Sequence, residues 1–169
     1  MHFSHGAVLF AMRLPEQALR EFELAISLDR NFAKAHVYLG LMKLCLGRAK
    51  ETEAHVAQAI RLSPRDPFLA IYAPVVRYMA LFALGRYEET IAVCRSTAAL
   101  HPNHAGAWRL MTVSLGLLGR IDEAKEALNH TLTLQPDLSS AHVANDTVYA
   151  DPADRSRFLE GLRKAGLKD

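Results

Sequence analysis

The sequence has few cysteines, no long apolar run and no block of like charge. No stretch of about 18 apolar residues occurs, and the first residues do not open a signal-peptide pattern, so we expect a cytoplasmic protein without membrane insertion. Basic residues are dispersed and the formal net charge is only +2, so we expect no nucleic-acid partner. The two cysteines, Cys45 and Cys94, fall inside helical patterns, which favours a reducing compartment over a disulfide framework.

Motifs for catalysis and cofactor binding are also missing. The two glycines of residues 116–119 are not followed by the lysine of a phosphate loop. The acidic pairs at 88–89 and 122–123 fall in first helical turns, where they interact favourably with the helix dipole. We therefore interpret them as residues of a solvated helix face and not as paired catalytic carboxylates. His101 and His104 flank a turn without a third ligand nearby. We therefore expect no enzyme, no metal and no cofactor in this chain.

A repeat of about 34 residues is the strongest pattern that is present. Gly-Arg pairs begin at Gly47, Gly85 and Gly119, which are 38 and 34 residues apart, and Arg13 precedes the first pair by 34. Such a period indicates stacked supersecondary units that bury their apolar faces against one another. We expect four repeats over residues 1–137, with units of about 1–32, 33–66, 67–104 and 105–138. A linker and a capping helix should follow over residues 138–169.

The apolar spacing inside each unit is helical. In the second unit Ala35, Leu39 and Met42 share one helical face, and Gly47 then supplies the left-handed backbone that commonly ends a helix. No alternating strand pattern competes, so the fold class is predicted to be all-α. The expected helices include 2–12, 15–28, 67–84, 87–100, 105–118 and 121–134. The second helix of the second unit is expected to turn Val56, Ala59, Ile60 and Leu62 inward. Pro74 inside 67–84 predicts a kink.

The positions of small and large residues resemble the tetratricopeptide repeat. The fourth unit carries the pattern as Ala107-Trp108, Leu115, Gly119, Ala124, Thr131 and Pro136. The resemblance implies a right-handed superhelix of helix hairpins that serves protein–protein interaction or self-association. Small residues are needed where the helices of a hairpin cross, and Ala18, Ala25, Ala59 and Ala124 are expected there. Tyr78 departs from this pattern, because it stands where the third unit should have a small residue.

The resemblance also implies which side chains line the concave groove, and nearly all of them are apolar. An apolar stripe of this kind usually marks an interaction site, so the expected partner is a protein or peptide with an apolar face, or a second copy of the chain. The alternative is that curvature and the last helix cover part of the stripe. The implied positions are Phe3, Ala7, Phe10, Val37, Leu41, Leu44, Tyr72, Val75, Met79, Phe82, Arg109, Val113 and Gly116.

The C-terminal segment predicts one further helix. Asp151 is a plausible N-cap, Pro152 suits the first position, and Gly166 ends the helix. Its apolar stripe is Phe158, Leu159, Leu162 and Ala165. The helix is expected to cap the stack.

The amino-acid sequence of residues 151–167 is similar to the extreme C-terminus of bacterial class III adenylate/guanylate cyclases that carry tetratricopeptide tails. The resemblance implies a regulatory tail in signal transduction, with the catalytic domain outside these residues. A stand-alone adaptor and the tail of a winged-helix transcriptional regulator are the alternatives. The first unit exposes Phe3 and Val8 without a preceding cap, so upstream sequence or cover by another chain is expected.

Overall fold

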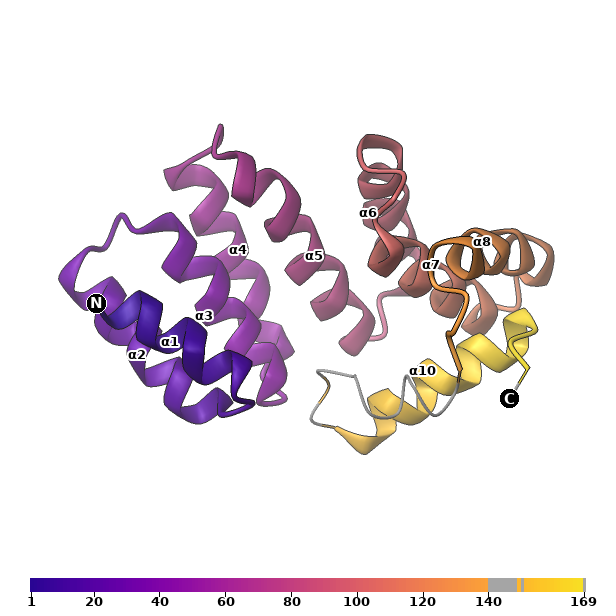
Figure 1. The fold of residues 1–169 in the computed structure, drawn as a ribbon, viewed down its shortest axis with the longest axis horizontal. Helices are drawn as coiled ribbons and strands as arrows, with labels where there is room; N and C mark the ends of the chain where they lie inside the picture. Colours follow the sequence, from indigo (N-terminus) through magenta and orange to yellow (C-terminus); the bar gives the residue numbers. More distant parts are fainter. Residues whose placement is uncertain (140–148, 150, 169) are drawn as a thin grey trace. The chain divides into compact units, whose positions relative to one another are not determined.

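The structure, a computed structural model, describes residues 1–139, 149 and 151–168, and every regular element in these ranges is an α-helix. The helices are α1 (His2–Ala11), α2 (Pro15–Leu28), α3 (Ala33–Cys45), α4 (Ala49–Leu62), α5 (Pro67–Ala83), α6 (Tyr87–Leu100), α7 (Ala105–Leu117), α8 (Ile121–Leu134) and α10 (Pro152–Ala165) (Figure 1). The all-α prediction is confirmed, and the helix bounds agree with it to within one residue. Most of the predicted linker, which is the part of residues 138–169 before α10, lies outside the described residues.

The turns between paired helices have left-handed backbone at the expected positions. The φ angles are 75° at Gly47, 72° at Gly85 and 74° at Gly119, a region that glycine enters without the penalty of a Cβ atom. The first hairpin places Arg13 in the same region, with φ 60°. A repeated glycine therefore fixes where three of the four hairpins reverse direction.

An arginine–glutamate pair follows each glycine turn. Arg48 Nε donates to Glu51 Oε1 at 2.6 Å, and a second guanidinium nitrogen donates to Oε2 at 2.8 Å. The same paired contacts recur as Arg86–Glu89 and Arg120–Glu123. Each carboxylate lies in the first turn of its helix, and the acidic pairs at 88–89 and 122–123 both fall in first turns, as predicted.

The chain divides into two compact units, Met1–Ala80 and Leu81–Asp169, and the boundary falls within α5. In unit 1 the α1–α2 and α3–α4 hairpins pack through contacts between α2 and α3. The small residues expected at its crossings are buried, with Ala18 and Ala59 fully covered and Ala25 6% exposed. Ile60 is 45% exposed, so its predicted inward orientation is wrong. It follows Ala59 by one residue, or about 100° around the helix, and therefore leaves the face that Val56 and Ala59 share.

Unit 2 consists of the end of α5, the helices α6 to α8, and α10. Ala124 is fully buried, as predicted. The buried Thr131 hydroxyl donates to the Ala127 carbonyl at 2.9 Å, so threonine is accommodated where the repeat pattern has alanine. α5 is described as one continuous helix through Pro74, and a kink there stays a prediction. Among the helices in the described ranges, none is both long enough and apolar enough to cross a membrane.

Candidate interaction surfaces

The structure buries six of the thirteen residues that the resemblance places in the groove. Val37, Leu41, Leu44, Phe82 and Val113 are each at most 3% exposed. In unit 1 the reason is that α3 is the central helix, with ten of its thirteen residues buried. A helix that is apolar on most sides packs into the interior and leaves little free surface. These five side chains therefore belong to the core, which corrects the groove expected from the sequence.

Gly116 is the sixth buried position, and the other seven are half-buried: Phe3, Ala7, Phe10, Tyr72, Val75, Met79 and Arg109. That these residues contact a partner stays a prediction.

Unit 1 gathers aromatic side chains from three helices around Tyr38 of α3. From α1, the ring of Phe3 lies 5.4 Å from that of Tyr38 and the ring of Phe10 lies 6.5 Å away. From α5, Phe68 stacks at 6.1 Å with an interplanar angle of 6°, and Tyr72 stacks at 5.2 Å. All five rings are half-buried, and we call them the aromatic face. Burial first, and the neighbouring Tyr38 second, raise the pKa of Tyr72 above its usual range.

Tyr38 and Phe68 were missed by the sequence analysis. The family offsets predict a role for positions 37 and 41 of the same helix, whereas in the structure Tyr38 is the residue that contacts the other rings of the aromatic face. The available signal was the spacing of aromatic residues at 68 and 72, four residues apart and therefore on one helical face.

In unit 2 the expected groove positions lie against α10. This helix packs along α7 and, to a smaller extent, α8 (Figure 1). The ring of Phe158 lies 5.7 Å from that of Phe82, and the Arg109 guanidinium lies 6.0 Å from the centre of the Phe158 ring. The last helix therefore covers this part of the stripe, which is the alternative that the sequence left open.

Two glycines allow α10 and α7 to touch through their backbones. A Cβ atom on Gly161 would lie 2.4 Å from the Val113 carbonyl oxygen, and a Cβ on Gly116 would lie 2.2 Å from the Gly161 carbonyl oxygen. Carbon and oxygen atoms do not approach this closely, so either side chain would force the helices apart. The contact explains why a flexible, helix-weakening residue stands inside α10 and at the second-last position of α7.

The N-terminal part of α10 is held by polar contacts. Arg157 donates to the Tyr87 hydroxyl at 3.0 Å and to the Ala83 carbonyl at 3.3 Å, and it forms an ion pair with the buried Asp154. Asp151 caps the helix by accepting a hydrogen bond from the Ala153 amide at 2.8 Å, as expected. Gly166, with φ 105°, ends it as expected.

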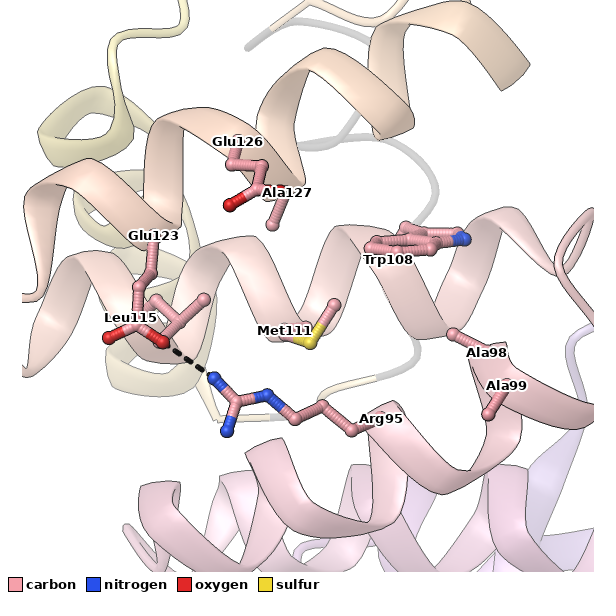
Figure 2. A pocket seen from close by; sticks show the side chains of 9 residues that line it. All are labelled: Arg95, Ala98, Ala99, Trp108, Met111, Leu115, Glu123, Glu126 and Ala127. Atoms are coloured by element: carbon pink, nitrogen blue, oxygen red, sulfur yellow. Dashed lines mark hydrogen bonds and ion pairs between the residues drawn. The ribbon is translucent and has the colours of Figure 1, made fainter.

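A hollow of about 300 Å³ opens between α6, α7 and α8 (Figure 2). Its walls are Ala98, Ala99, Trp108, Met111, Leu115 and Ala127. Arg95, Glu123 and Glu126 complete the lining, and Arg95 donates to Glu123 at 2.6 Å. We call this site the α6–α8 hollow. The sequence analysis did not anticipate it, because it depends on small residues from separate helices.

The titratable groups do not form a catalytic arrangement in the part of the chain that the structure describes. Cys94 is fully buried, and burial raises the pKa of its thiol well above the usual range; burial also raises the pKa of Cys45 to about 11. His104 caps α7 by accepting from the Ala107 amide at 3.2 Å. Across the described residues, no three His, Cys, Asp or Glu side chains are grouped as metal ligands.

Comparison with known proteins agrees with this architecture. The tetratricopeptide repeat family matches residues 81–145. The human protein O-mannosyl-transferase TMTC1 is 23% identical over 131 residues, which are 78% of this chain and 14% of that protein. The chain therefore spans about one seventh of the length of this curated relative.

Two solved structures have the same fold. TTC0263, a thermophilic tetratricopeptide protein of Thermus thermophilus, matches with a TM-score of 0.68 and 21% identity over 96% of this chain and 97% of its own. YrrB, described as a tetratricopeptide protein with an unusual peptide-binding site, matches with a TM-score of 0.63 and 21% identity over 97% of this chain and 82% of its own. The chain thus has the fold of tetratricopeptide repeat proteins.

Proposed function

We propose that the chain is a protein-interaction module whose aromatic face binds an apolar helix or peptide segment, or the same kind of segment on a second copy. The observation that carries the proposal is the position of α10. In unit 2 an amphipathic helix already lies along α7, the first helix of its repeat, on the positions expected to bind a partner. The inner helices of this chain are therefore suited to hold a helix.

The aromatic face offers the corresponding chemistry in unit 1. Tyr38 and Tyr72 combine broad apolar rings with hydroxyl groups, a combination that is enriched among residues that dominate binding energies. Aromatic rings also contribute large contact areas for little loss of side-chain freedom. These properties support a peptide or helix as the ligand of this face.

A peptide library displayed on phage tests the proposal, with the whole chain as the target. We expect selected peptides to lose at least about fivefold in affinity when Tyr72→Ala or Phe10→Ala removes a ring, since truncation of a central aromatic contact typically costs more than about 1 kcal/mol. Ile60→Ala on α4 is the matched control, because this side chain is 45% exposed and lies outside the aromatic face. Peptides that bind all three variants equally would contradict the proposal.

A narrower proposal concerns the intact protein. The similarity of residues 151–167 to cyclase tails supports a role as the cytoplasmic regulatory tail of a bacterial nucleotidyl cyclase. We expect the intact natural polypeptide to convert ATP or GTP to a cyclic nucleotide and residues 1–169 alone to convert neither. An intact polypeptide without cyclase activity would favour the adaptor or the winged-helix regulator instead.

A further inference from the structure

The α6–α8 hollow is apolar in its depth and charged at its edge, where Glu123 and Glu126 outnumber Arg95. Figure 2 shows Trp108 and Met111 on α7 facing the small side chains of α6, with Glu126 and Ala127 on α8. Glu123 is engaged by Arg120 and by Arg95. Glu126 is exposed, and the described residues supply no ion-pair partner for it.

The repeat shows which side chains stand at the corresponding positions of unit 1. When Gly47 is aligned with Gly119, Lys43 corresponds to Leu115, Glu51 to Glu123 and His55 to Ala127. Aligning Arg13 with Gly85 places Ile26 at the position of Ala98. Unit 1 thus has larger side chains at three positions where unit 2 has leucine or alanine.

Lys43 is the central occupant in unit 1. Only 7% of this lysine is exposed, and its Nζ donates to Glu51 Oε2 at 2.7 Å. Burial lowers the pKa of the adjacent His55, and the positive charge of Lys43 adds to this effect. A lysine stem inside the packed helices, with its ammonium on a glutamate at the edge, is therefore an arrangement that this fold already contains.

Unit 2 keeps the edge glutamate, as Glu123, and lacks the lysine; its second edge glutamate, Glu126, stands where unit 1 has Ala54. Leu115 is 1% exposed and carries no charge, and Ala98 and Ala127 of the hollow are smaller than Ile26 and His55, which stand at the corresponding positions of unit 1. The face of Trp108 adds a surface that attracts cations.

We propose that the α6–α8 hollow binds a lysine side chain presented by a partner protein. The alkyl stem lies against Trp108, Met111 and Leu115, and the ammonium donates to Glu126 at the edge. In unit 1 Lys43 bonds to Glu51, whose counterpart Glu123 already accepts from Arg95 and Arg120 in unit 2, so the partner's lysine pairs with Glu126 instead. This inference is independent of the aromatic face, because it concerns other helices and a different ligand.

Trp108 makes the proposal directly measurable, since it is the only tryptophan of the chain. The probe is Nα-acetyl-lysine methylamide, and its norleucine counterpart, which lacks the ammonium group, is the matched control ligand. We expect the lysine probe to change Trp108 emission saturably. The norleucine probe should bind about 2- to 5-fold more weakly, the factor that a partly exposed ion pair provides.

Two variants distinguish the contribution of the Glu126 charge to binding from the contribution of the cavity. Glu126→Gln should weaken the lysine probe by about the same 2- to 5-fold and leave the norleucine probe unchanged. Ala98→Ile, which copies Ile26, should abolish binding of both probes by filling the hollow, with unchanged helicity by circular dichroism. Equal affinity for the two probes, no saturable change in emission, or full binding by Ala98→Ile would each overturn the proposal. Tyr72→Ala should bind the lysine probe normally, so failure at one site is distinguishable from failure at the other.

Discussion

Replacing Gly161 with alanine should loosen α10 from α7, although alanine is the better helix former. The added Cβ would lie 2.4 Å from the Val113 carbonyl oxygen and 2.8 Å from the Val113 Cγ1. The oxygen belongs to the backbone of a packed helix, so no rotation of a flexible side chain can remove that contact. The two helices have to separate.

The magnitude follows from two opposing effects. Overpacking costs about 1–3 kcal/mol, and a contact with backbone lies toward the upper end of that range. The gain in helix propensity from glycine to alanine is at most about 1 kcal/mol. The net loss in the free energy of unfolding is therefore about 1–2 kcal/mol, which lowers the Tm of a chain of this size by about 2–8 °C.

Thermal unfolding followed by circular dichroism measures the loss of stability. Limited proteolysis with trypsin shows which helix is loosened. Cleavage after Arg157 and Arg163 should be faster in Gly161→Ala, because both sites lie in α10. Ser156→Ala, on the exposed side of the same helix, is the control that gains propensity without a clash. A Gly161→Ala chain as stable as the unmodified one would refute the close backbone contact.

Two further predictions concern ionisation and thiol reactivity. Hydrogen bonds from Arg48, and next from Lys43, lower the pKa of Glu51 to about 2, so the stabilisation from this carboxylate is present above its usual pKa near 4.5 and is lost as the pH falls toward 2. Urea unfolding at pH 7 and pH 2 should therefore show that Glu51→Gln is destabilising at the higher pH and nearly neutral at the lower; equal effects would contradict the ion pair. Burial raises the pKa values of Cys94 and Cys45, so both thiols should react slowly with a thiol reagent at pH 8. The fully buried Cys94 should react more slowly than Cys45. Unfolding in urea should abolish the difference between the two rates.

Local signals were sufficient to predict the helices and their turns. Each hairpin boundary is determined by residues adjacent in sequence, as where Gly85 or Gly119 adopts a left-handed backbone and a helix begins two residues later. Pro152 and Gly166 bound α10 in the same local way. Such features need no knowledge of distant contacts.

The interaction surfaces depend on contacts that are remote in sequence. The position of α10 requires Gly116 and Gly161 to meet, and neither glycine is unusual on its own. Leu41 and Leu44 were expected at a groove because their helical offsets are those of the family, but enclosure by neighbouring helices decides their burial. The α6–α8 hollow arises from what several small side chains leave unfilled together.

The position of α10 has a thermodynamic consequence for binding in unit 2. A tethered segment competes with every free ligand for the surface around Val113 and Phe82. If α10 were seated in about 99% of molecules, the apparent Kd of a competitor would be about 100-fold weaker than its intrinsic value. A dilute ligand would then rarely displace it, whereas one held at millimolar effective concentration by a common scaffold would do so readily. Unit 2 would thus discriminate among ligands by their local concentration as well as by their shape.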